Sequence, residues 1–351
     1  MRKRRIWLAA GVVVVILLIA GAVYMRKLAA PEVARLLPEG EGVVYISFSG
    51  FRLASSFGSS PVTLSREPEY EEFLRQTGFQ FERDLDEIAI AIHPAEIAPR
   101  PLGPEMQRRY SQIFNARFDA AKLNHYLHKL ASGVEKYRNF DVFTIPHEGR
   151  TIRVSILSVN LVAVSNTTDP AIIRGMIDRH LKIALPFGGA QLLRDHYRHV
   201  PIGSSAWAIV SLPSPEGRAM TLPLPNGIEF QLPAKTVTVA SLRYLGAIQF
   251  KAESFTANAA DAKQLTDSLT NFLQLFRAVE SNVQTGGPDR DVKAFFDSLK
   301  VEQHNTRSVL TAELPAGFIQ KAMTDAPTPA APPADPKSEP APAPKAKGKK
   351  N

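Results

Sequence analysis

Residues 6 to 24, IWLAAGVVVVILLIAGAVY, form a long apolar run without a single charge. At about 1.5 Å of rise per residue, a helix of this run spans roughly 28 Å, which is enough to cross a bilayer. Four basic residues precede the run and two follow it, so the positive-inside rule places the N-terminus in the cytoplasm. The pattern predicts a cytoplasmic basic leader and a transmembrane signal anchor within residues 1–27.

A cleaved signal peptide is the competing interpretation of the same run. Its apolar core would be only about 7 to 15 residues long and would end at a pair of small residues. Here the core is longer, and Met25, Arg26 and Lys27 follow it. The nearest small-residue site, Leu28-Ala29-Ala30, is followed directly by Pro31. We therefore expect the anchor to be retained.

Beyond the anchor, strand and helix patterns alternate. A β-branched and aromatic run predicts a strand at 43–48, and apolar positions spaced by three or four predict a helix at 67–77. A buried strand is expected at 88–92, ending at His93-Pro94, with a proline-rich connection over 94–104. A strand at 112–118 then leads into a helix capped by Asp119.

The remaining elements follow from the same two periodicities. Asp169-Pro170 supplies an N-cap and a proline at the first helical position, and Asn226-Gly227 predicts a hairpin turn. A long apolar stripe predicts a helix from Asn258. The other expected elements are strands at 140–145, 151–157, 161–165, 206–212, 236–244, 247–254, 301–305 and 308–314, and helices at 292–299 and from Pro315.

Two segments show a strand running into a capped helix rich in Ala, Lys and Leu: ARFDAAKLNHYLHKL and AESFTANAADAKQLTDSL. The pair suggests an internal repeat of split β-α-β type. The predicted fold class is α+β, with two ferredoxin-like halves whose antiparallel sheets are covered by helices. We expect exported domains at 28–185 and 186–324. The tail at 325–351, rich in Pro, Ala and Lys, is expected to be disordered.

The formal charge of +8 belongs to the two ends of the chain. The first 27 residues hold six Lys and Arg without an acid, and the tail from Asp325 holds five Lys against three acids. The rest carries 31 basic and 31 acidic residues. A neutral body argues against binding to nucleic acid, which needs clustered positive charge. The absence of cysteine excludes disulfides and thiolate sites.

Two groups of residues are candidates for chemistry. His125 and His128 lie three apart on a predicted helix, a spacing that places two imidazoles near one metal ion. A solvated helix face explains them better, because no third ligand accompanies them, and neither a metal nor a cofactor is predicted. Asp195, His196 and His199 resemble the acid and imidazole of a hydrolase. No nucleophile motif accompanies these three, so surface structure is the favoured interpretation.

The order of segments resembles a group of uncharacterised single-pass bacterial envelope proteins that carry a domain of unknown function. The resemblance rests on the basic leader, the apolar helix and the phrases LLPEGEGVVYISF, FDAAKLNHYL and SVLTAELPAGFIQKAM, and it covers most of residues 36 to 323. It implies a periplasmic body held to the membrane and assigns no catalytic residue.

These observations favour a non-enzymatic interaction or scaffold protein of the cell envelope, anchored in the bacterial inner membrane with its body in the periplasm or outside the cell. Its partners would be the lipid bilayer, through residues 6–24, and an envelope protein or cell-wall polymer. The alternatives are an envelope hydrolase that uses Asp195, His196 and His199, and a carrier of lipid or another hydrophobic ligand.

Overall fold

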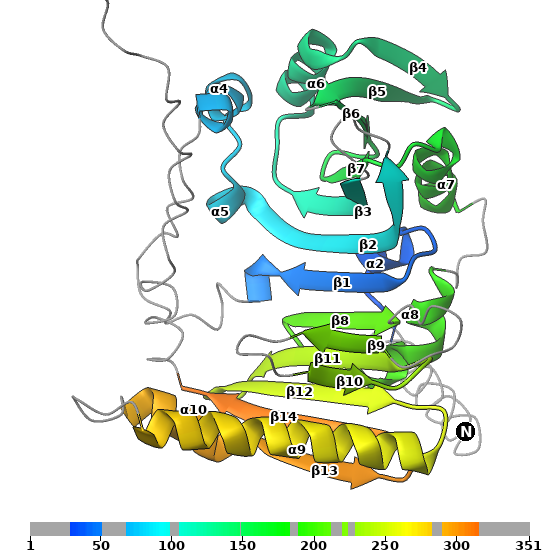
Figure 1. The fold of residues 1–351 in the computed structure, drawn as a ribbon. Coiled ribbons are helices and arrows are strands. Elements are labelled where there is room, and N and C mark those ends of the chain that lie inside the picture. The colour runs from blue at the N-terminus through cyan, green and yellow to red at the C-terminus, as the bar shows by residue number, and fades with distance from the viewer. Residues whose placement is uncertain are drawn as a thin grey trace, which may run out of the picture.

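The computed structural model describes residues 29–50, 68–98, 105–147, 149–182, 189–211, 220–223, 229–282 and 290–315. Within these ranges, twelve strands form one antiparallel sheet (Figure 1). In spatial order they are β13 (Lys300–His304), β14 (Arg307–Leu314), β12 (Ile248–Phe255), β11 (Val237–Tyr244), β8 (Ala206–Ser211), β1 (Gly42–Ser47), β2 (Leu85–Ala98), β3 (Glu105–Ala116), β7 (Leu161–Ser165), β6 (Arg150–Ile156), β5 (Phe140–His147) and β4 (Gly133–Tyr137). A separate hairpin joins β9 (Met220–Pro223) to β10 (Glu229–Leu232).

One face of the sheet carries the main core. Here α2 (Glu32–Arg35), α7 (Pro170–His180) and α8 (Gln191–His196) cover the strands, and η1 (Tyr197–His199) continues α8. Val43 on β1 lies opposite Ala91 on β2 and Ile209 on β8, and all three are fully buried. Because small and β-branched side chains stand beneath the helices, these helices approach the sheet closely.

The opposite face carries α6 (Ala120–Leu130) and α9 (Ala259–Asn282). Leu127 of α6 packs with Phe143, Val154 and Val162 in a second cluster. At the other end of the sheet, Leu265 of α9 is buried, and Thr266 Oγ1 lies 2.9 Å from Ser308 Oγ on β14. Near this end of the chain, α10 (Arg290–Ser298) precedes β13. Amphipathic helices therefore cover both ends of this face.

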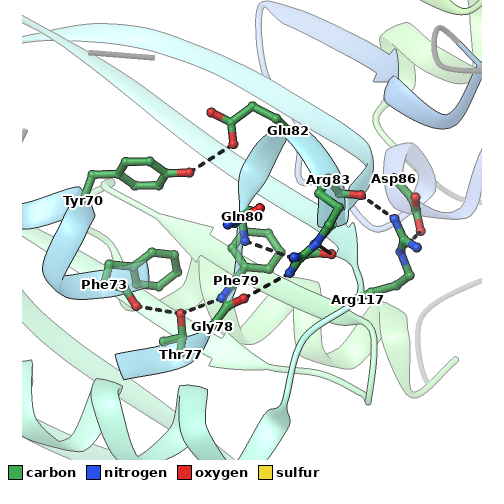
Figure 2. A network of polar contacts seen from close by, with 11 residues as sticks. Tyr70, Phe73, Thr77, Gly78, Phe79, Gln80, Glu82, Arg83, Asp86 and Arg117 are labelled. Atoms are coloured by element: carbon green, nitrogen blue, oxygen red, sulfur yellow. Dashed lines mark hydrogen bonds and ion pairs between the residues drawn. The ribbon is translucent and has the colours of Figure 1, made fainter. Parts of the chain in front are cut away.

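A third cluster, made of aromatic side chains, joins α4 (Pro68–Thr77) and α5 (Phe81–Asp84) to α6. Phe73 packs edge-on against Phe79, with ring centres 5.9 Å apart, and against Tyr126 of α6 at 5.4 Å. Tyr70 stacks on Phe81 at 5.8 Å and donates a hydrogen bond of 3.2 Å to Glu82 Oε2 (Figure 2). Aromatic contacts thus hold helix α4 against the rest of the structure.

Beside these rings, a polar network fixes α5 against the ends of β2 and β3. Arg83 Nε donates a hydrogen bond of 2.8 Å to Asp84 Oδ1, and Arg83 Nη2 donates one of 3.3 Å to the carbonyl of Gly78. Arg117 donates to the backbone carbonyl of Arg83 and pairs with Asp86 at 3.6 Å (Figure 2). Every member of this network binds another part of the chain, so we interpret it as structural.

The continuous sheet overturns the predicted pair of ferredoxin-like halves. Strands β1 and β8, from the two expected halves, are direct neighbours through five residue pairs. The strands β1-β2-β3-β7-β6 and β8-β11-β12-β14-β13 are arranged in the same order, and each three-strand run leads into a helix, α6 or α9. The connections then differ, because β4 and β5 follow α6 and α10 follows α9. The repeated strand-to-helix step is therefore present, but within one sheet. The expected domain boundary at residue 185 lies outside the described residues.

Most predicted strands and helices are present, with three corrections. Strand β2 does not end at His93-Pro94 but continues to Ala98, with an irregularity between His93 and Glu96. Strand β3 begins at Glu105, before residue 112, where the predicted strand starts. The edge strand β4 and the short helices α2 and α8 were not predicted. The anchor at 6–24, the turn at 226–227, the helix predicted from Pro315 (apart from Pro315 itself) and the tail at 325–351 lie outside the described residues.

Among the helices that the structure describes, none combines the length and the apolar character needed to cross a bilayer.

Candidate functional site

A half-open pocket of about 490 Å³ lies on the face that α2 and α8 cover. Its residues come from β1, β8 and β12 of the sheet, from the N-cap of α2, and from η1 and the loop that follows it. The lining residues are Pro31, Tyr45, Tyr197, Arg198, His199, Val200, Pro201, Ile202, Gly203, Ser204, Trp207, Lys251 and Glu253.

Aromatic side chains form the floor of the pocket. Tyr45 and Trp207 face each other across the β1–β8 pair and stack with ring centres 5.4 Å apart. Tyr197 meets Trp207 edge-on at 5.3 Å. The Tyr45 hydroxyl donates 2.9 Å to Glu87 Oε1, and burial, together with the Glu87 charge, raises the pKa of Tyr45. Tyr45 therefore stays a neutral hydrogen-bond donor and serves as structure.

One wall is organised around Glu253, a carboxylate that is only 7% exposed. Lys251 Nζ lies 2.6 Å from its Oε1 atom. His199 Nδ1 and an Arg307 guanidinium nitrogen lie 3.8 and 3.9 Å from its Oε2 atom. Buried carboxylates persist where cations surround them. Lys251 and Arg307 are two basic side chains beside one carboxylate, so the wall has an excess of positive charge.

His199 is oriented by contacts on both ring nitrogens. Arg198 Nε donates 3.2 Å to His199 Nε2, which leaves the proton on Nδ1, toward Glu253. The ring lies 4.5 Å from the Phe255 ring. Burial lowers the pKa of His199, and the Glu253 charge opposes that effect. His199 is therefore a neutral imidazole near pH 7.

The structure separates the predicted hydrolase residues. His196 and His199 are half-buried with ring centres 6.4 Å apart, whereas Asp195 is exposed. Burial is the main cause of the lowered pKa of His196. The acid beside His199 is Glu253, not Asp195. In the described part of the chain, no hydroxyl hydrogen-bonds to either imidazole, and His199 Nε2 already accepts from Arg198. A general base acting on a serine needs that nitrogen free.

The other histidine pair lies on the opposite face of the sheet. His125 and His128 are both exposed on α6, and His128 packs edge-on against Phe143 at 4.9 Å. Over the residues described, no three His, Cys, Asp or Glu side chains gather closely enough to hold a metal ion. The aromatic contact gives His128 a packing role.

A buried chain of hydroxyls beneath α2 escaped the sequence analysis. His93 Nε2 lies 2.8 Å from Ser111 Oγ, which lies 3.0 Å from Ser165 Oγ, followed by Thr167 Oγ1 at 2.8 Å. A histidine beside a serine has the contacts of a nucleophile and its base. Ser111 has no exposed surface, however, so a substrate cannot reach it. The chain satisfies polar groups inside the core. No local motif indicates it, because its members lie on β2, on β3, and on and just after β7.

A second pocket, of about 550 Å³, adjoins the first and shares Pro201 and Lys251 with it. It lies over β11, β12 and β14, where the exposed sheet face is polar. Its other lining residues are Ser241, Arg243, Gln249, Phe250, Asp297, Ser298, Lys300, Thr311, Ala312 and Glu313. Lys251 thus stands between two cavities.

No family model matches the sequence, and no curated protein matches it. The chain is similar to three solved structures of TP0453, crystal forms III, IV and I, at 9%, 10% and 9% identity. These matches cover 85%, 83% and 84% of this chain and 99%, 96% and 97% of TP0453, with TM-scores of 0.44, 0.42 and 0.41.

Proposed function

We propose that this chain is a single-pass protein of the bacterial inner membrane, with a body outside the cytoplasm that binds a ligand or partner and performs no reaction. The apolar run at 6–24 and the basic residues on both sides of it support the anchor and its orientation. The 31 basic and 31 acidic residues between positions 28 and 324 support a body that remains in water, because charged side chains stay almost always at the surface.

The pocket beneath α8 is the binding site in this proposal. The observation that carries it is the wall of Lys251, His199 and Arg307 around Glu253, at the edge of a cavity of about 490 Å³. Cavities of this size hold small ligands, and a few fixed polar groups orient them. With Arg198 and Lys251 against one carboxylate, the lining favours an anionic group.

The same geometry supports binding over hydrolysis. An acyl-transfer site needs a nucleophile within hydrogen-bond reach of its base and donors for the developing oxyanion. Ser204, the serine in the pocket lining, donates its hydroxyl proton to the carbonyl of Pro201 at 2.7 Å. The His199 nitrogen that would take its proton accepts from Arg198.

Protease accessibility in cells tests the location of the body. In intact spheroplasts of a Gram-negative host, added protease should degrade the body and leave a membrane-bound N-terminal fragment. A cytoplasmic protein expressed alongside should stay intact. Protection of the body until the inner membrane is permeabilised would overturn the proposed orientation.

In-cell crosslinking tests the interaction role. The full chain and a version truncated before Pro327 are crosslinked in the membrane, and the products are identified by mass spectrometry. Recovery of one defined envelope partner by both versions would assign the contact to the body. Loss on truncation would assign it to the tail. Efficient crosslinking that yields no specific product with either version would contradict a protein-scaffold role and leave the pocket ligand as the remaining form of the proposal.

A further inference from the structure

We infer that the pocket faces the membrane in which the chain is anchored and binds the anionic headgroup of a lipid. This inference rests on the proposed function, because it needs the anchor at 6–24. It adds the chemical class of the ligand, a phosphate-bearing lipid headgroup, and names the groups that contact it.

The first argument is reach. Pro31 lines the pocket, and it follows Tyr24, the last residue of the apolar run, by seven positions. Seven residues span at most about 25 Å even when fully extended. The headgroup layer itself extends several ångströms outward from the hydrocarbon. The anchor therefore holds the pocket at the membrane surface.

The second argument is charge. Arg198 is exposed at the pocket, and Lys251 stands on its wall. Glu253 is the acid in the lining, and it is already shared among Lys251, His199 and Arg307. Arg243 and Lys300 extend the cationic surface into the adjoining pocket, which also contains Asp297 and Glu313. Cations next to a membrane attract anionic lipids, and Arg and Lys side chains donate strong hydrogen bonds to phosphate oxygens.

The third argument is the apolar rim. Ile202, in the pocket lining, is 58% exposed. The neighbouring β11–β12 turn presents Leu245 at 59% and Tyr244 at 40% exposure. Ser205 N donates 2.9 Å to the carbonyl of Leu242, which ties the Ile202 loop to the end of β11. Exposed apolar side chains next to cations fit the boundary between headgroups and acyl chains.

The chain supplies its own reporter for a test. It contains two tryptophans, Trp7 in the anchor and Trp207 in the pocket floor. The full chain carrying Trp7→Phe therefore emits from Trp207 alone. It is reconstituted into nanodiscs of phosphatidylcholine, or of phosphatidylcholine mixed equally with phosphatidylglycerol. Both contain the same fraction of a lipid with a nitroxide on its headgroup, which quenches nearby tryptophan.

We expect stronger quenching of Trp207 in the anionic nanodiscs. Arg198→Glu should abolish the difference between the two lipid mixtures, because it removes a hydrogen-bond donor to the phosphate and adds a negative charge that repels the headgroup. Lys263→Glu, an equal change of charge at an exposed site on α9, should leave the difference intact. Circular dichroism confirms that both variants fold.

Equal quenching in the two lipid mixtures would overturn the inference, as would equal losses in the two variants. A further arm adds free glycerol 3-phosphate to the neutral nanodiscs and follows the Trp207 emission. If the free anion changes the emission while lipid composition has no effect on quenching, the ligand is a soluble phosphate compound. That result overturns the lipid inference but leaves the binding function standing. Failure of the protease test would reject the anchored function itself.

Discussion

Glu253 lies close to two cations and an imidazole in the pocket wall. Its neighbours arrive from three elements: Lys251 from its own strand, His199 from η1 and Arg307 from β14. Since Lys251 and Arg307 are each more than a third exposed, water weakens the individual pairs. The carboxylate itself is buried, so its removal affects both stability and the charge of the pocket.

We expect Glu253→Gln to lower the free energy of unfolding by about 1–3 kcal/mol, because Lys251 and Arg307 lose the negative charge beside them and one acceptor oxygen is replaced by an NH2 donor. It should also strengthen the quenching of Trp207 in anionic nanodiscs, since the pocket gains positive charge. Urea denaturation and the nitroxide assay measure the two effects. Glu302→Gln, at an exposed site on β13, is the control for both. A variant that loses stability and quenching together would contradict the assigned role of the charge.

Asp84 gives a pH-dependent prediction. The hydrogen bond from Arg83 is the main cause that lowers the pKa of Asp84, and burial opposes it. A lowered carboxyl pKa stabilises the folded state above the unfolded pKa of about 3.9, and this contribution disappears as the pH falls through the folded value.

Asp84→Asn should therefore cost about 1–2 kcal/mol at pH 7, the lower part of the range for charged hydrogen bonds, because Arg83 is exposed. The difference from wild type should shrink below about pH 4. Urea unfolding between pH 3 and pH 7 measures it, with the exposed Asp267→Asn as the matched change. A difference that stays constant down to the lowest pH would show that packing, not charge, is responsible.

The sequence predicted only part of the candidate site, because the residues that meet there are far apart in the chain. The segment RDHYRH drew attention to the region of His199, which lines the pocket. Its acid could not be identified, because Glu253 lies on a strand 54 positions further along the chain. Asp195 was a sequence neighbour, but its helix directs it to solvent. Spatial partners across a sheet leave no local signature.

At the scale of elements, local signals were more informative. Asp119 and Asp169 cap α6 and α7 as their sequence contexts predict. Strand β4 escaped because its residues are almost all exposed, so no alternation of burial marks it. Pro94 failed to end β2 because it lies at the irregularity between His93 and Glu96, beyond the last residue that pairs with β1. A proline is tolerated where a ladder hydrogen bond is already missing.

The N-cap of α6 offers a direct test at this scale. Asp119 accepts hydrogen bonds from the backbone nitrogens of Ala121 and Lys122 at 3.0 and 3.1 Å. Asp119→Ala should lower the free energy of unfolding by about 1 kcal/mol, as the loss of a cap usually does. Asp119→Ser keeps an acceptor and should recover most of that loss. Equal urea midpoints for the Ala variant and wild type would show that the cap contributes nothing here.

At the scale of the whole molecule, the prediction of two separate sheets failed because pairing between distant strands is not encoded locally. Hydrophobic alternation shows that β1 and β8 are strands, and it does not reveal that they are neighbours. Their contact also assembles the pocket, since Tyr45 and Trp207 stack across it. The pocket is thus a product of the continuous sheet.

Expression of the chain in pieces tests this dependence. Segments 28–185 and 186–324, made separately, should each expose the unpaired edge of β1 or β8 and aggregate or remain largely unfolded. The intact body should unfold in one cooperative transition. Circular dichroism and gel filtration report both outcomes. Two soluble fragments with native-like spectra would contradict the prediction and support two independent domains.

The position of β1 also has a consequence for how the chain is made. About 160 residues separate it from β8, and a ribosome adds about 5–20 residues per second, so β8 emerges on the order of 10–30 s after β1. Throughout that interval one side of an apolar strand has no partner of its own. Nascent chains with an unpaired strand edge depend on chaperones, and such chains on neighbouring ribosomes should tend to aggregate with one another. The pairing of β1 with β8 that creates the pocket therefore leaves the nascent chain prone to aggregation until β8 has been synthesised.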